Sequence, residues 1–150
     1  MTKSIETLSV SLFSEILALE QLLRSRISKG LPKGMELSHF SVLNHLAHVG
    51  GERTPAQLAK TFNLTRGAMT NTLNKLEWAG YVHIRPDWDD ARRKMVAISP
   101  AGQRAREQAL NSFAPLVSDV IEQLGEESVR ATLPILRQLR MQLSLKTKPD

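Results

Sequence analysis

The sequence predicts a mainly α (α+β) fold in which helices surround a small two-stranded hairpin. Three observations predict it. Apolar residues recur every three or four positions over most of the chain, which is the period of amphipathic helices. Two helix starts with capping residues stand close together between residues 54 and 66, and two short stretches after residue 81 alternate apolar and polar residues. The expected order is helix, helix, helix-turn-helix, two-stranded wing and two further helices.

The N-terminal region, from Ile5 to about Ser28, predicts one long amphipathic helix. At 1.5 Å per residue it would run about 36 Å, more than a small domain needs for its own core, so part of it is expected to pack against another chain. Its apolar stripe consists of Leu8, Leu12, Ile16, Leu19, Leu23 and Ile27.

Residues 29–36, rich in glycine and proline, predict a loop, after which Ser38 is expected to cap a second helix that stops at Gly50. The strongest helix start follows. Thr54 suits the N-cap, Pro55 the first helical position, and Gln57 completes a capping box.

A second start follows at once, because Asn63 tolerates a left-handed turn and Thr65 offers another cap. The next helix is expected from Arg66 to Ala79, and together the two form a helix-turn-helix. Its inward face is predicted to consist of Met69, Leu73 and Leu76.

Two period-two stretches, around residues 82–84 and 96–98, predict strands joined by a long polar tip at residues 86–93. Beyond Ser99 and Pro100, the apolar period predicts two helices separated near Gly125. Pro115 and Pro134 lie inside these helices and are expected to kink or restart them.

Composition narrows the function classes. The chain has 150 residues, 41% hydrophobic content, a net charge of +5 and no cysteine. The charge favours a polyanionic partner, and the missing cysteine excludes disulfides, thiolate zinc sites and thiol-based redox sensing. Without a membrane-length apolar run or a secretory h-region, a cytoplasmic protein without membrane contact is expected. Nothing supports an enzyme, because no nucleophile or phosphate-binding motif occurs.

The stretch from Lys60 to Lys75 contains three basic residues and no acidic one. Its expected exposed face offers hydroxyls, amides and cations that can donate to base edges and phosphates, although an ordinary solvated helix surface is the alternative. Gly67 suits a close approach to a DNA phosphate, or equally a tight contact between helices.

On the wing, Arg92 is expected to enter the minor groove, held in orientation by Asp90, with Arg93 and Lys94 at phosphates. A solvated hairpin is the alternative. The histidines predict no metal site, because ligands are too few. No cofactor is expected. A ligand pocket between the helical arms and the central lobe would be lined by Arg24, His39, Phe40 and Leu43, each of which could equally be core, interface or surface.

The chain resembles the MarR family of winged helix-turn-helix transcriptional regulators over nearly its whole length. Three stretches carry the resemblance: the helix pair at 54–59 and 65–70, the segment 76–82, and the wing from 87 to 102 with Asp90-x-Arg92. One departure concerns wing conformation, since Asp87 is followed by Trp88 where the family often has proline.

The resemblance implies a homodimer with interlocked end helices, which binds a palindromic operator with its recognition helices in major grooves and its wings in flanking minor grooves. It also implies a small anionic or phenolic effector. Residues 1–150 are expected to form one MarR-like domain, with the DNA-binding lobe at 38–99 and the dimerisation region at 5–28 and 100–145.

The sequence thus predicts a sequence-specific DNA-binding regulator, most simply a ligand-responsive repressor. A non-specific architectural DNA-binding protein and a helical protein-interaction module are the alternatives. The residues expected to contact double-stranded DNA are Thr54, Thr65, Arg66, Gly67, Thr70, Asn71, Asn74, Lys75, Asp90, Arg92, Arg93 and Lys94.

Overall fold

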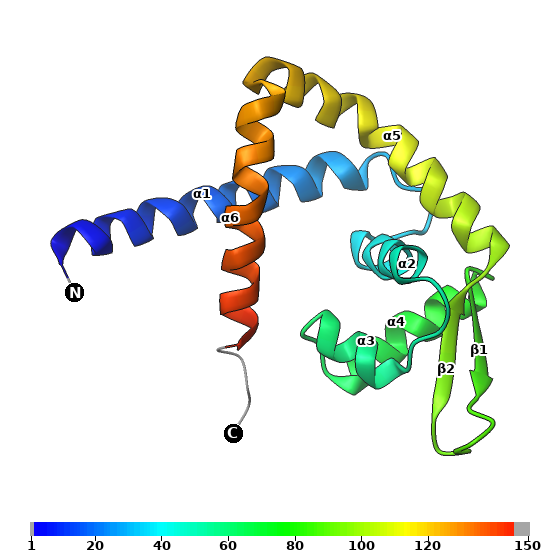
Figure 1. The fold of residues 1–150 in the computed structure, drawn as a ribbon. Helices are drawn as coiled ribbons and strands as arrows, with labels where there is room; N and C mark the ends of the chain where they lie inside the picture. Colours follow the sequence, from blue (N-terminus) through cyan, green and yellow to red (C-terminus); the bar gives the residue numbers. More distant parts are fainter. Residues whose placement is uncertain (1, 146–150) are drawn as a thin grey trace. The chain divides into compact units, whose positions relative to one another are not determined.

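The computed structural model describes residues 2–145 and confirms the mainly helical fold with a two-stranded wing (Figure 1). Two compact units divide the chain, one ending at Phe113 and the other beginning at Ala114. The elements are α1 (Lys3–Ser28), α2 (Leu37–Val49), α3 (Pro55–Thr61), α4 (Arg66–Trp78), β1 (Val82–Pro86), β2 (Lys94–Ile98), α5 (Pro100–Leu124) and α6 (Glu126–Leu145).

One apolar core holds the helix-turn-helix and the wing together in the first unit. The inward face predicted for α4 is confirmed, because Met69, Leu73 and Leu76 are all buried. Removing such side chains from water stabilises the fold by about 1.5–3 kcal/mol each. The largest fully buried side chains come from four elements and are Val42, Leu43, Leu46, Leu58, Met69, Leu73, Leu76 and Val96.

The helix-turn-helix begins and turns as its caps dictate. The Thr54 side chain accepts a hydrogen bond from the backbone N–H of Gln57 (3.1 Å), and the Gln57 side chain accepts one from the Thr54 N–H (2.9 Å). Thr65 caps α4 by accepting from the Ala68 N–H at 3.1 Å. Between the helices Asn63 adopts φ 52°, the left-handed turn that its residue type allows. All three predicted features are confirmed.

The start of α2 differs from the expectation. Ser38 does not cap this helix, because the helix begins one residue earlier at Leu37 with Glu36 at the N-cap. His39 sits three residues after Glu36, and its Nδ1 accepts the Glu36 backbone N–H at 3.2 Å. A reciprocal box between a carboxylate and an imidazole thus replaces the serine cap.

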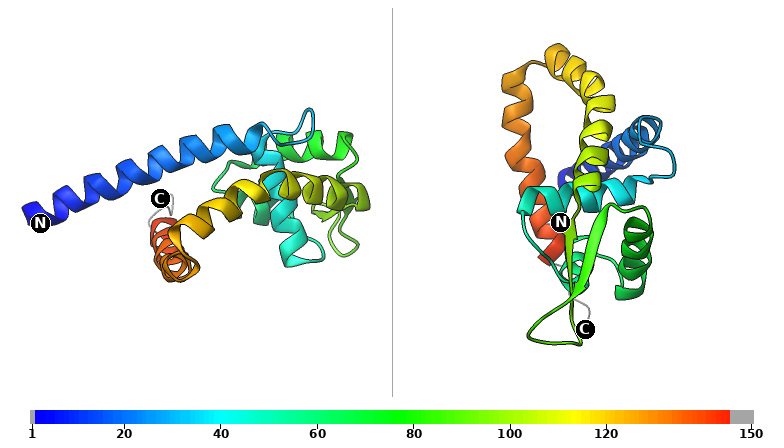
Figure 2. Two further views of the ribbon diagram at one scale, coloured as in Figure 1. Left: turned by 90° about the horizontal axis from the view of Figure 1, so that it is seen from above. Right: turned by 90° about the vertical axis from the view of Figure 1, so that its right-hand side faces the viewer.

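The wing is an antiparallel hairpin whose register pairs Val82 with Ile98 and Pro86 with Lys94. It extends away from the lobe's helices (Figures 1 and 2). A backbone bridge to Arg53 fastens it to the helix-turn-helix: the Arg53 N–H donates to the Val96 carbonyl (2.9 Å), and the Val96 N–H donates back (2.8 Å). The wing therefore cannot rotate freely about its two ends.

The prolines do not restart the C-terminal helices. Both α5 and α6 continue through Pro115 and Pro134, so a helix can lose one hydrogen bond at each proline and still propagate on either side. The expected break near Gly125 is confirmed, with φ 89° at that glycine. No helix among the described residues is long and apolar enough to cross a membrane.

Burial of His39 makes stability depend on pH. Desolvation lowers the pKa of His39 below its ordinary 6.5, against the opposing effect of Glu36, and nearby Lys75 lowers it further. The unfolded chain therefore binds a proton at His39 more readily than the folded chain does. The stability that neutral His39 contributes is complete above about pH 6.5 and is lost as the pH falls below that value. Protonation would also remove the Nδ1 acceptor that caps α2.

We therefore expect the free energy of unfolding, measured by urea denaturation, to fall between about pH 7.5 and about pH 5. In His39→Asn, whose amide oxygen can still accept the Glu36 N–H, this fall should be shallower. His83→Asn, at an exposed position on β1, is the control and should keep the full pH dependence. An unchanged slope in His39→Asn would contradict this account.

Candidate nucleic-acid interface

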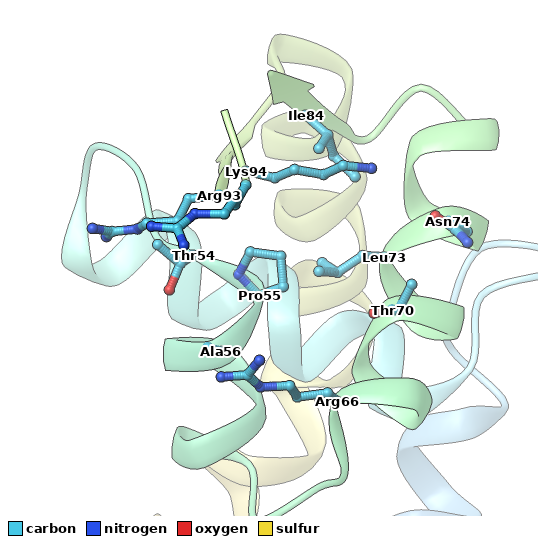
Figure 3. A pocket seen from close by; sticks show the side chains of 11 residues that line it. Thr54, Pro55, Ala56, Arg66, Thr70, Leu73, Asn74, Ile84, Arg93 and Lys94 are labelled. Atoms are coloured by element: carbon cyan, nitrogen blue, oxygen red, sulfur yellow. The ribbon is translucent and has the colours of Figure 1, made fainter. Parts of the chain in front are cut away.

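An open hollow of about 480 Å³ lies between the start of α3, one face of α4 and the tip end of the wing (Figure 3). In the close-up, Thr70 and Asn74 enter from α4, while Arg93 and Lys94 enter from the wing, with Pro55 between the two sides. The hollow is lined by Thr54, Pro55, Ala56, Arg66, Thr70, Leu73, Asn74, Ile84, Arg92, Arg93 and Lys94.

The lining is strongly positive. Arginine and lysine supply its charged groups, and none of its residues is acidic. Since backbone and side-chain donors at α4 adjoin these cations, the surface is suited to an extended polyanion. Arg66 and Arg93, which are far apart in the sequence, thus contribute to one positively charged surface.

The exposed residues of α4 form two adjacent rows. Arg66, Thr70 and Asn74, spaced by four, line the hollow. Asn71 and Lys75 occupy the next row and are also exposed. The second row lies opposite the buried face and the first row lies between the two, so α4 presents a polar surface along its length.

Gly67 begins the second row. A Cβ atom built at this position would meet nothing within 4 Å in the described chain. Tight packing against another helix within the described chain therefore does not account for the glycine, and its close approach to a DNA phosphate stays a prediction.

Thr54 and Thr65 serve as the N-caps of their helices. Their side-chain oxygens accept capping hydrogen bonds, and Thr54 is buried while Thr65 is exposed. These residues set the starts of α3 and α4, where orphan N–H groups and the positive end of the helix dipole favour anions.

The wing tip has a defined hydrogen-bonded shape. Asp90 accepts from the Arg92 backbone N–H (3.0 Å) and from the Arg92 Nε (3.1 Å), as its expected orienting role requires. These hydrogen bonds hold the pKa of Asp90 below its usual value. Arg93 lies 3.7 Å from an Asp87 carboxylate oxygen. The Arg92 side chain stays 90% exposed and thus available to a partner.

The sequence analysis missed a second cluster on the wing. Arg85 donates to both carboxylate oxygens of Glu52, from Nε (2.9 Å) and Nη2 (2.6 Å). Its guanidinium also lies over the Trp88 ring, 4.9 Å from the centroid. Glu52 and Arg85 are 33 positions apart, so no local spacing in the sequence could have revealed the pair. The unusual Asp87-Trp88 start of the tip was the one sequence feature that drew attention to Trp88.

The candidate ligand residues lie apart from the hollow. His39, Phe40 and Leu43 are buried on α2, and Phe40 packs edge-to-face on Phe113 with centroids 5.5 Å apart. Arg24 is exposed on α1, paired with Glu20. Among the described residues no group of three histidines or carboxylates could hold a metal ion.

A capped helix-turn-helix followed by a two-stranded wing defines the class: a winged helix-turn-helix protein. Comparison with known proteins gives the same class. A MarR family model matches residues 33–93, which span α2 to the wing tip. The uncharacterized HTH-type transcriptional regulator YwhA of Bacillus subtilis is 26% identical over 128 residues, 79% of this chain and 92% of that protein. The HTH-type transcriptional repressor YetL of the same species is 27% identical over 114 residues, 75% and 68%.

Solved structures share the fold. A mutant MarR from E. coli complexed with operator DNA has a TM-score of 0.75 and 23% identity, covering 87% of this chain and 94% of that one. The transcriptional regulator BldR from Sulfolobus solfataricus has a TM-score of 0.72 and 26% identity, covering 92% and 99%. The resemblance predicted from the sequence is confirmed: the chain matches the MarR family model over its central lobe and is similar to HTH-type transcriptional regulators with the same fold.

Proposed function

We propose that this chain binds a specific operator in double-stranded DNA and represses transcription by occupying it. The observation that carries the proposal is the carboxylate-free hollow, where the exposed row of α4 meets the cations of the wing. α4 would enter a major groove, with Asn71 and Asn74 at base edges and Arg66 at a phosphate. The wing would reach the flanking minor groove through Arg92.

The proposed active form is a homodimer. α1 contains no buried residue among those described, although its stripe is apolar: Leu8 is 68% exposed and Leu19 is 54% exposed. An uncovered stripe of this length is unfavourable in water, and a second copy would cover it. Two recognition helices related by a two-fold axis would then bind a palindrome with half-sites about 10 bp apart.

A small anionic or phenolic effector would regulate binding. The support is indirect: the fold is shared with the PcaV regulator from Streptomyces coelicolor, whose structure holds its natural ligand, at a TM-score of 0.71 and 16% identity. In this chain the proposed site is near Arg24, His39, Phe40 and Leu43, where the end of α1 approaches α2. Cytoplasmic location is part of the same proposal.

A non-specific architectural DNA-binding protein is the rival reading, and hydroxyl and amide groups on α4 argue against it. The test compares affinity for a duplex selected by the protein from fragments of its source genome with affinity for random duplex. The selected duplex should bind at least about a thousandfold tighter at physiological salt. Equal affinities would overturn the specific-regulator proposal.

The minor-groove role of Arg92 predicts a change in salt dependence. Arg92→Ala should weaken binding to the selected duplex and lower the magnitude of the salt slope by up to about one, because a complex with one cation fewer at the DNA releases fewer counterions. Fluorescence anisotropy at several salt concentrations measures both quantities. Arg130→Ala, an exposed arginine of α6, is the control and should leave the slope unchanged; equal slopes for all three proteins would contradict the role of Arg92.

Asn71 should contribute base preference instead. Asn71→Ala should narrow the affinity difference between selected and random duplex by about 1–3 kcal/mol, while the salt slope stays as it was. Competition binding measures that difference. Asn111→Ala, exposed on α5, serves as the matched asparagine control. A variant that loses affinity equally for both duplexes would show that Asn71 does not contact a base edge.

The α1 stripe predicts the assembly. Light scattering should give about twice the chain mass of 16.8 kDa for the unmodified protein. Leu19→Glu should shift the protein towards monomer, because the new carboxylate would be buried unpaired in the interface. Ser14→Glu, on the opposite side of α1, should remain dimeric. Monomeric unmodified protein, or a Leu19→Glu variant as dimeric as the control, would contradict the assignment.

A further inference from the structure

The wing carries a large aromatic side chain that the fold leaves largely in water. Trp88 is 80% exposed, although it sits in a tip whose backbone is closely hydrogen-bonded. The Asp87 N–H donates to the Arg93 carbonyl, and the Arg93 N–H donates to the Asp90 carbonyl, both at 3.0 Å. Trp88 is therefore held at a defined place on the tip without being packed into a core.

Arg85 orients the ring. Its guanidinium lies 4.9 Å from the ring centroid and is itself held by Glu52 through two hydrogen bonds. A cation over the face of tryptophan is attracted by the ring quadrupole. Since Glu52 already satisfies Arg85, covering that guanidinium does not explain why so large an apolar side chain stands here.

Trp88 lies on the face of the wing that points away from the hollow. Successive strand residues point to opposite faces, and Ile84, the residue before Arg85, lines the hollow. Arg85 and the ring stacked on it therefore belong to the outer face, whereas Arg92, Arg93 and Lys94 line the hollow.

The acidic and basic side chains of the wing tip balance one another in charge. Residues 87–94 carry no net charge, because they contain three acidic and three basic residues. These are Asp87, Asp89 and Asp90 against Arg92, Arg93 and Lys94. Net electrostatic attraction from the tip as a whole is therefore modest, and apolar area would add to the affinity there. In the minor groove, deoxyribose rings provide that area along the groove wall.

We infer that Trp88 is a DNA-contacting residue of this wing, which packs its free ring surface against deoxyribose in the wall of the minor groove that Arg92 enters. The inference rests on the proposed DNA-binding function. The Glu52–Arg85 pair acts as the positioning element, because it fixes the guanidinium on which the ring rests. Such a contact is apolar and independent of base sequence.

Quenching of tryptophan fluorescence tests the contact directly. The chain has two tryptophans, so Trp78→Phe leaves Trp88 as the sole tryptophan, and Trp88→Phe leaves Trp78, which is 94% exposed at the end of α4. Acrylamide quenching of Trp88 should fall severalfold when the selected duplex is added at saturation, and quenching of Trp78 should change less. Trp88 that remains as quenchable in the complex as in the free protein would overturn the inference.

Affinity provides the second measurement. Trp88→Ala should bind both selected and random duplex about tenfold more weakly with an unchanged salt slope, because apolar contact releases no counterions. Trp88→Phe should restore most of the affinity. Wild-type affinity in Trp88→Ala would overturn the inference, whereas failure of the unmodified chain to bind any duplex would overturn the proposed function itself. Circular dichroism verifies folding, and the quenching result stands without the alanine variant.

Discussion

The DNA-binding lobe depends on one apolar core that joins α2, α3, α4 and β2. Leu73 shows the dependence most directly, because it is buried and its edge also lines the hollow. If α4 rotated on this core by one residue position, its two polar rows would turn away from the wing and the buried row would meet water. Burial of the apolar face thus determines where the polar face points, and the proposed DNA contacts follow from packing.

The second constraint is the attachment of the wing. Backbone hydrogen bonds between Arg53 and Val96, together with the Glu52–Arg85 ion pair, connect the residues just before α3 with both strands. These contacts place Arg93 and Lys94 beside α4. The net charge of +5 alone would not locate a nucleic-acid site, whereas the hollow gathers four cations and has no acidic residue in its lining, with Asp90 and Asp87 pairing with Arg92 and Arg93 from outside it.

Local features could be predicted from the sequence, and long-range ones could not. The Thr54 and Thr65 caps, the turn at Asn63 and the buried face of α4 follow from interactions within a few residues, so their patterns were sufficient. Ser38 was a wrong cap because the pair of Glu36 and His39 competes for the same position.

Long-range contacts left no such pattern in the sequence. The bridge from Arg53 to Val96 and the contact of Glu52 with Arg85 join distant positions, and the hollow exists only once α3, α4 and the wing have packed. Of the residues expected to contact DNA, the structure therefore brings Thr54, Arg66, Thr70 and Asn74 together with the wing cations, while Asn71 and Lys75 lie on the neighbouring row.

The most direct test of the account is a hydroxyl-radical footprint of the unmodified protein on its selected duplex, since this reagent cleaves from the minor groove. Two symmetric half-sites should appear, about one helical turn apart, each flanked by a protected minor-groove segment from one wing. Leu19→Glu should lose this paired pattern. A single half-site, or uniform protection without flanking minor-groove segments, would contradict a dimer that binds DNA through paired recognition helices and wings.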